Sequence, residues 1–174
     1  MVTILCGYVI LTATGTPSEA WWDAAWKYRQ RVDINASGLD KDLIDFPLSL
    51  RLSDAQFART RCAEGGKDLR AVSGDGAVLP CEIVRWEPNA VEVHIRVPKI
   101  IANAPGQHVD LYYGNSSAPA APTGAIWNSH YRSVLHLAGN LNNAVSGQPG
   151  AQVVEGVRVA DRSEERRVGK ECRL

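Results

Sequence analysis

Residues 90–115, with the sequence AVEVHIRVPKIIANAPGQHVDLYYGN, decide the fold of this chain. From residue 91 to residue 97, aliphatic side chains alternate without interruption with polar or charged ones. A period of two residues is typical of a β-strand that buries one face and exposes the other. After a connection rich in Pro, Gly and Asn, the alternation resumes over residues 109–113 and stops at Gly114 and Asn115. The stretch therefore predicts two strands of one sheet.

The same alternation recurs in the chain before this stretch. It predicts further strands over residues 28–34, 46–52, 68–72 and 78–86. Pro47 cannot donate a ladder hydrogen bond, which places its strand at a sheet edge or at a strand start. Residues 53–56 resemble a capping box and predict one helical turn, and residues 73–76 predict a hairpin turn. Six short strands without a long amphipathic helix predict an all-β fold, an antiparallel β-sandwich of jelly-roll or immunoglobulin-like type.

The N-terminal segment has the composition of an export signal. Residues 2–14 are uncharged and largely apolar, but shorter than the roughly 20 residues of a membrane-spanning helix. Small residues, Ser18 and Ala20, precede Trp21 in the pattern of a cleavage site. No Lys or Arg comes before Lys27, so the usual basic start is missing. We interpret residues 1–20 as a signal peptide whose start is cut or misassigned; a buried N-terminal strand is the alternative.

The C-terminal segment differs in composition from everything before it. Residues 162–172 match, codon by codon, the in-frame translation of a common sequencing adapter, and we interpret residues 162–174 as an artefact of that origin. A solvated basic and acidic tail is the alternative. The segment holds five of the 19 basic and three of the 19 acidic side chains, so the remainder has 14 and 16, a formal charge of about −2. No basic patch is left that would indicate a nucleic-acid partner.

A second domain is expected to start after the first sandwich. Residues 118–122 belong to a stretch of small residues and Pro that is typical of a linker. Residues 132–137 predict a strand, but residues 123–161 are too few for a domain. We interpret residues 123–161 as the truncated start of a second β-sandwich.

The cysteine count favours an oxidising compartment. Cys6 lies in the predicted signal peptide and Cys172 in the predicted artefact, which leaves Cys62 and Cys81. Two cysteines suit a single disulfide, which would stabilise the fold by about 3 kcal/mol in the chain-entropy model. The predicted hairpin places Asp68 roughly opposite Cys81, with Cys62 one loop away. The spacing matches no zinc site, so no metal or other cofactor is expected.

Aromatic side chains are the candidate ligand-binding residues, because rings stack on the faces of sugars. Three indoles stand within six residues near the expected start of the mature chain, and two tyrosines end the last predicted strand. The candidates are Trp21, Trp22, Trp26, Tyr112 and Tyr113. The alternative is that these rings cover the open end of the core, and only an outward ring could serve a ligand.

No constellation of catalytic residues stands out. The histidines, His94, His108, His130 and His136, lack paired spacing for a metal. The carboxylates, Asp68, Asp75, Glu82, Glu87 and Glu92, are spread over turns and outward strand positions, as on a solvated sheet face. There is no GxSxG motif and no phosphate-binding loop. We therefore predict a protein that is not an enzyme.

Six motifs in order resemble the bacterial family called domain of unknown function 2341, over about residues 21–117. They are WW-x-x-x-W-x-YR at 21–29, DFPLSLRL at 45–52, KDLR at 67–70, LPCEIVRW at 79–86, VHIRVPKI at 93–100 and LYYGN at 111–115. Cys81 departs from the aromatic or polar residue that is usual at this place, which suggests that its pairing with Cys62 is a local feature. The family has no assigned catalytic residues.

The resemblance implies a wider setting. In that family the domain often follows a signal peptide and precedes a concanavalin A-like, laminin-G-type sandwich, whose opening resembles residues 134–137. In many such proteins a MotA/TolQ/ExbB-type proton channel domain comes next, so this chain would meet the membrane only through missing downstream domains.

Three functions remain open. The favoured one is a non-catalytic module exported to the periplasm or cell exterior, with a binding or spacing role in a larger envelope protein and a glycan or an envelope protein as partner. The second is an accessory module of a secreted carbohydrate-active hydrolase. The third is a hydrolase in its own right, for which no nucleophile and base are visible.

Overall fold

The computed structural model describes residues 21–119, 121, 126–137 and 140–152. The predicted signal peptide and the predicted adapter-derived tail lie outside the described residues. The chain divides into two compact units, Met1–Ile126 and Trp127–Leu174.

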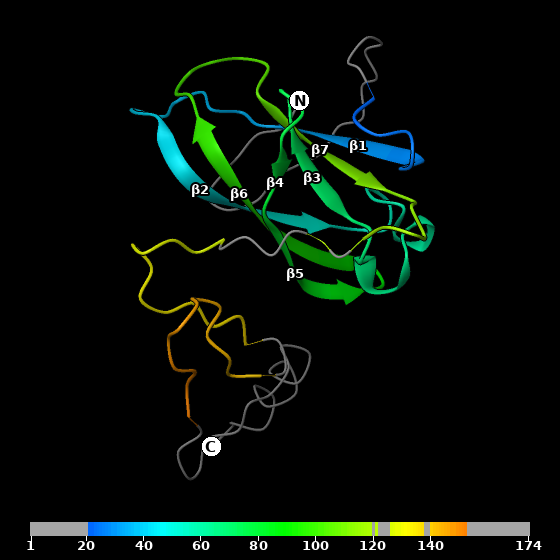
Figure 1. Cartoon of the computed structure of the whole chain (residues 1–174). Coiled ribbons are helices and arrows are strands. Elements are labelled where there is room, and N and C mark those ends of the chain that lie inside the picture. The colour runs from blue at the N-terminus through cyan, green and yellow to red at the C-terminus, as the bar shows by residue number, and fades with distance from the viewer. Residues whose placement is uncertain (1–20, 120, 122–125, 138–139, 153–174) are drawn as a thin grey trace, which may run out of the picture. The chain divides into compact units, whose positions relative to one another are not determined.

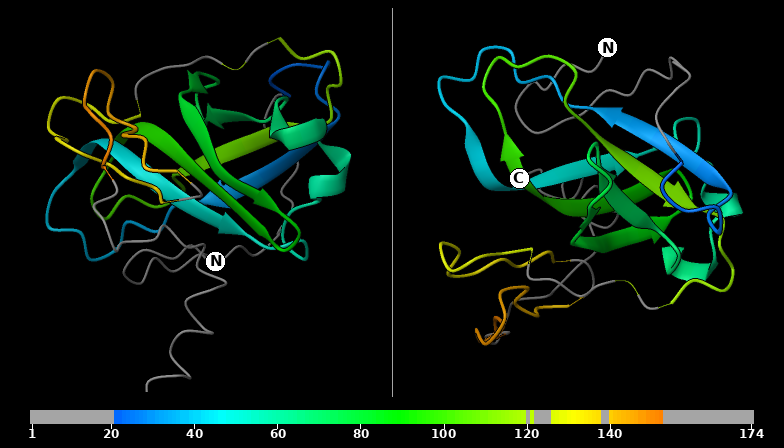
Figure 2. Two further views of the ribbon diagram at one scale, coloured as in Figure 1. Left: turned by 90° about the horizontal axis from the view of Figure 1, so that it is seen from below. Right: turned by 45° about the horizontal axis from the view of Figure 1, so that its top comes forward.

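The first unit contains two antiparallel sheets, which form the two layers seen in Figures 1 and 2. The four-stranded sheet has the order β1 (Tyr28–Asp33), β7 (His108–Tyr113), β3 (Arg70–Ser73) and β4 (Val78–Leu79). The three-stranded sheet has the order β2 (Leu43–Leu52), β6 (Ala90–Ile100) and β5 (Cys81–Glu87). The predicted all-β antiparallel sandwich is confirmed, and β2 is an edge strand, as Pro47 predicts.

The inward faces of the two sheets form the main core. On β6, Val91, Val93 and Ile95 are at most 1% exposed, while the polar side chains between them are half-buried on the other face. These side chains belong to one cluster with Val109 and Leu111 of β7, from the opposite sheet. The alternation that predicted the strands therefore also predicted which face is buried.

Pro80 divides one predicted strand into two. The chain over residues 78–86 forms β4 in one sheet and β5 in the other, because Pro80 has no N–H for a ladder. The Pro80 carbonyl instead accepts a hydrogen bond from the N–H of Arg96 at 3.0 Å. The expected register is thus wrong, since Cys81 lies opposite Ile95 of β6 and not opposite Asp68.

The loop between β2 and β3 contains the predicted helical turn. The Ser53 N–H and hydroxyl both donate to Gln56 Oε1, at 3.1 and 2.9 Å, which is one half of a capping box, and the N–H of Phe57 donates to the Ser53 carbonyl at 2.9 Å. Two short 3-10 turns follow, η1 (Arg59–Arg61) and η2 (Glu64–Gly66). Among the described residues no helix has the length and apolar character needed to cross a membrane.

The second unit contains little regular structure in the part that is described. The strand predicted over residues 132–137 is not formed. A single antiparallel bridge joins Leu135 to Asn143, and the N–H of Ala144 donates to the Val134 carbonyl at 2.9 Å.

Asp68 is a fully buried carboxylate that joins distant parts of the first unit. One oxygen accepts the N–H of Ala63 at 2.8 Å, and the other accepts the N–H groups of Gly114 and Asn115 at 2.6 and 3.0 Å. The interpretation of Asp68 as part of a solvated sheet face is therefore wrong. The carboxylate is tolerated in the interior because three N–H groups replace its water.

Gly114 is required beside this carboxylate. Its φ of +89° is in the left-handed region, and a Cβ there would lie 2.5 Å from Cδ2 of Tyr28. A side chain at this position would therefore be strained and would clash with a ring of the core. The glycine turns the chain after β7 so that two successive N–H groups face Asp68.

Arg70 makes a second buried connection. Its guanidinium donates to the main-chain carbonyls of Lys67, Leu69 and Pro119, the last one 49 residues away in the chain. The pKa of Arg70 is lowered, because the effect of burial outweighs those of Cys81 and Asp68, which raise it. Arg70 of β3 therefore holds the segment that follows β7 in place, through charge-assisted hydrogen bonds to main-chain carbonyls.

Replacing Asp68 tests the buried carboxylate. We expect Asp68→Asn to lower the free energy of unfolding by about 3 kcal/mol, because an amide presents donors to N–H groups that need acceptors. Urea denaturation followed by circular dichroism measures the change. Asp75→Asn, in the exposed hairpin turn before β4, is the control and should change stability much less. Equal losses in the two variants would contradict this role of Asp68.

Candidate functional site: an aromatic cluster on the outer face of the four-stranded sheet

The outer face of the four-stranded sheet carries a row of large side chains. Tyr112 of β7 lies in register between Arg29 of β1 and Arg70 of β3. Residues on one face of neighbouring strands at such positions are in contact distance. β7 is consequently buried on both faces from Val109 to Tyr113, and not on one face as the alternation predicts.

The segment before β1 covers this row. The rings of Trp21, Trp22, Trp26 and Tyr112 form what we call the outer aromatic cluster. The centroid of Trp22 lies 4.9 Å from that of Trp26 and 5.5 Å from that of Tyr112, and Trp21 meets Tyr112 edge to face at 5.4 Å. Distances of this size are favourable for aromatic pairs.

Hydrogen bonds fix the indoles in place. Trp26 Nε1 donates to the main-chain carbonyl of Asp68 at 2.7 Å, which connects the cluster to the buried carboxylate. The N–H of Trp22 donates to the Tyr112 hydroxyl at 3.2 Å. Trp21 Nε1 donates to the carbonyls of Asp23 and Trp26, both at 2.9 Å. The polar ring atoms of Trp21, Trp26 and Tyr112 are thus hydrogen-bonded, and Trp22 is connected through its main-chain N–H.

Two guanidinium groups lie over rings of the cluster. Arg70 lies over Trp26 with its central carbon 5.4 Å from the ring centroid, and Arg29 lies over Trp21 at 5.7 Å. Arg29 also approaches Asp110, with 3.7 Å between the guanidinium nitrogen and the carboxylate. Asp110 is only 5% exposed, so this ion pair is partly removed from water.

The five predicted ligand-binding residues differ in how far they are exposed to solvent. Trp26, Tyr112 and Tyr113 are at most 5% exposed, and Trp22 is half-buried. Tyr113 belongs to the main core, where its ring meets Phe57 at 4.8 Å. Trp21 remains 45% exposed. The candidate ligand surface is therefore Trp21 with Arg29 over its ring, and the other four rings support the fold.

Arg29, Arg70 and Asp110 were not among the predicted site residues. Each is next to a residue of the main core on its strand, as the sequence pattern indicates. Their meeting depends on the order β1-β7-β3, which joins residues about 40 to 80 positions apart and leaves no local signal.

The two cysteines lie at the margin of the main core as free thiols. Cys62 follows η1, and Cys81 begins β5. Burial and the nearby Asp68 raise the pKa of the Cys62 thiol to about 12, and burial raises that of Cys81. The disulfide between them stays a prediction.

Within the described residues, no three His, Cys, Asp or Glu side chains are placed to hold a metal ion. The buried charged side chains there are Asp68, Arg70 and Asp110. The first two bind main-chain groups, and the third faces Arg29. These groups are therefore engaged in holding the fold.

These observations define the class of protein as a two-sheet antiparallel β-sandwich with a partly exposed aromatic cluster. Residues 65–131 match the family model of the domain of unknown function (DUF2341). The match covers β3 to β7 and supports the resemblance drawn from the later motifs; the motifs at 21–29 and 45–52 precede it. Comparison with curated proteins and with solved structures gives no match.

Thiol reactivity tests the burial of the cysteines. In the reduced, folded protein at pH 8 we expect iodoacetamide to alkylate Cys62 and Cys81 far more slowly than in urea, because the thiolate is the reactive form and both pKa values are raised. Mass spectrometry over time measures the rates. Similar rates in folded and unfolded protein would show that the thiols are not buried.

Export of the chain tests the predicted disulfide. Non-reducing peptide mapping of protein made in the bacterial periplasm should recover Cys62 and Cys81 in one linked peptide pair. Two free thiols in that material would refute the pairing, as would a distance between the Cα atoms well beyond about 7 Å.

Proposed function

We propose that residues 21–117 form a non-catalytic, exported binding module. The contacts of the buried charged groups support a binding role rather than a catalytic one. Asp68 and Arg70 are hydrogen-bonded to main-chain groups, and Asp110 faces Arg29. A catalytic group needs a free position toward a substrate, whereas these side chains are engaged by the protein itself.

The proposed ligand is a glycan, bound through Trp21. The single observation that carries this proposal is the exposed indole at the edge of an otherwise buried aromatic cluster, 45% accessible and with its N–H fixed by two carbonyls. The face of such a ring stacks on the apolar face of a sugar. The Arg29 guanidinium lies over the ring and its side chain is 21% exposed, so it offers donors for sugar hydroxyls.

The proposed setting is the bacterial cell envelope. The resemblance of residues 21–117 to domain of unknown function 2341 suggests a module ahead of a concanavalin A-like domain and a MotA/TolQ/ExbB-type proton channel. The second candidate is an accessory module of a secreted carbohydrate-active hydrolase, which the exposed indole equally favours. The source gene distinguishes the two: several long apolar segments beyond residue 161 would indicate the channel protein, and a carboxylate-rich domain would indicate the hydrolase.

A glycan array followed by calorimetry with the full chain tests the ligand. We expect binding of a glycan without its hydrolysis, and Trp21→Ala should weaken it about tenfold, because the stacking surface is lost.

The control for this experiment is Val78→Ala, which removes a 37% exposed apolar side chain from the opposite edge of the same sheet. It should bind as the unchanged protein does. The lectin-like proposal fails if the folded protein binds no glycan or if both variants bind equally well, and a spacing role then remains.

A further inference from the structure

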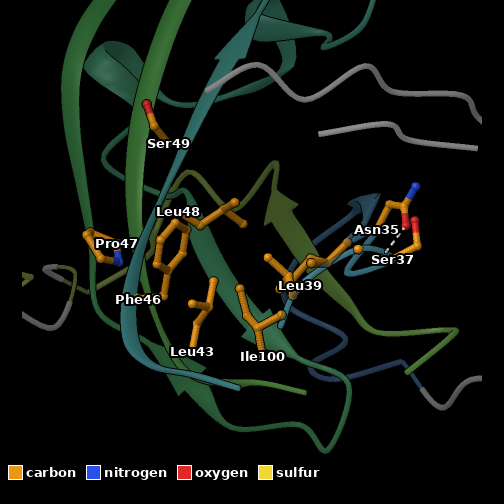
Figure 3. A pocket seen from close by; sticks show the side chains of 11 residues that line it. Asn35, Ser37, Leu39, Leu43, Phe46, Pro47, Leu48, Ser49 and Ile100 are labelled. Atoms are coloured by element: carbon orange, nitrogen blue, oxygen red, sulfur yellow. Dashed lines mark hydrogen bonds between the residues drawn. The ribbon is translucent and has the colours of Figure 1, made fainter. Parts of the chain in front are cut away.

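A second site lies away from the outer aromatic cluster, between the start of β2 and the loop that follows β1. It is a pocket of about 510 Å³, a volume within the range of small-molecule sites. Figure 3 shows apolar side chains turned toward a common space, with Asn35 and Ser37 to one side of it and Ser49 and Pro47 along β2. The apolar side chains are Ile34, Leu39, Leu43, Phe46, Leu48 and Ile100.

The pocket exists because the alternation of inward and outward side chains is interrupted at the same level in the paired strands β2 and β6. Asp45 of β2 has a φ of +49°, and it faces Pro98 of β6, where the register omits a pair. Beyond this point Leu43 lies opposite Ile100, which is 2% exposed, whereas Ile44 is 63% exposed. The irregularity therefore keeps apolar side chains inward at the end of the sandwich, where β2 begins and β6 ends (Figure 1).

The loop wall of the pocket is fixed rather than loose. Asn103 accepts the N–H of Gly38 at 3.0 Å and donates to the Leu39 carbonyl at 3.0 Å. Asn35 accepts the N–H of Ser37 at 2.9 Å. The Asn103 amide and the Asn35 oxygen are used within the protein, so Leu39 is held at its place.

Two pairs of opposite charges lie near the pocket. Lys99 lies 2.9 Å from Asp42, and Arg96 lies 3.8 Å from Asp45. None of the residues that line the pocket is charged, so the lining favours an uncharged ligand.

An added β-strand is a poor occupant, although the pocket borders the free edge of β2. The N–H of Arg96 points away from β2 and donates to the Pro80 carbonyl. Pro47 is paired with Arg96 in the ladder, so the main-chain nitrogen of Pro47 also points away from β6, to the free edge of β2. A proline nitrogen has no hydrogen to donate to an added strand. The bend at Asp45 further disturbs that edge. Both features are ways in which natural sheets prevent edge pairing.

We propose that this pocket binds the alkyl or acyl chain of an uncharged lipid or long-chain alcohol. Aliphatic walls with a single ring, Phe46, suit a flexible chain better than a flat aromatic ligand. The proposal is independent of glycan binding at Trp21, which lies on the outer face of the other sheet.

The experiment uses the full chain and the uncharged dye N-phenyl-1-naphthylamine, whose fluorescence rises in an apolar site. Straight 1-alkanols from hexanol to dodecanol should displace the dye, and each added methylene should tighten binding on the order of fourfold until the pocket is full. Dodecanoate should compete more weakly than dodecanol, because its carboxylate would lose water and find no charged side chain in the lining of the pocket.

Paired variants locate the site. Leu43→Asn and Leu39→Asn place an amide on two walls of the pocket and should abolish dye binding, whereas Ile44→Asn, one position along and facing outward, should not. Thermal unfolding checks that each variant folds. If Leu43→Asn does not fold, the Leu39→Asn variant decides the result, because Leu39 lies in a loop. Absence of dye binding by the folded protein, an affinity independent of chain length, or equal loss in Ile44→Asn would overturn the proposal.

Discussion

The buried carboxylate of Asp68 is the interaction on which the arrangement of the first unit depends. Removing a carboxylate from water costs several kcal/mol, which its three N–H donors must offset together. These donors come from the loop before η2 and from the turn after β7, and the Asp68 carbonyl also accepts Trp26 Nε1. A single residue thereby fixes the end of β7, the loop that carries Cys62 and the segment that bears the indoles.

This constraint explains why the outer face of the four-stranded sheet differs from an ordinary solvated face. Trp26 is held over β3 and β7, so Tyr112 and Val72 become a second, small core. Trp21, at the margin of that core, keeps its ring partly in solvent. The pocket at the start of β2 arises from a different cause, the bend shared by Asp45 and Pro98. The exposed indole and the apolar pocket thus belong to separate parts of the fold.

The sequence predicted the strands well because burial of one sheet face imposes a period of two, which residues 91–97 follow without exception. It misplaced Cys81, because a strand that changes sheets at Pro80 looks locally like one strand. It also treated Asp68 as solvated, since two of the three N–H donors that permit its burial are 46 and 47 residues away. The candidate rings were recognised by type, but which of them is exposed depends on the sheet order, and so does the meeting of Arg29 with Asp110.

Amide hydrogen exchange measured by NMR tests the central role of Asp68 most directly. The N–H groups of Ala63, Gly114 and Asn115 lie in turns, outside the named strands, where amides usually exchange rapidly. If Asp68 holds them, they exchange only through global unfolding, with the same free energy of opening as the central amides of β6. Exchange at rates typical of exposed turns, while β6 stays protected, would contradict the account.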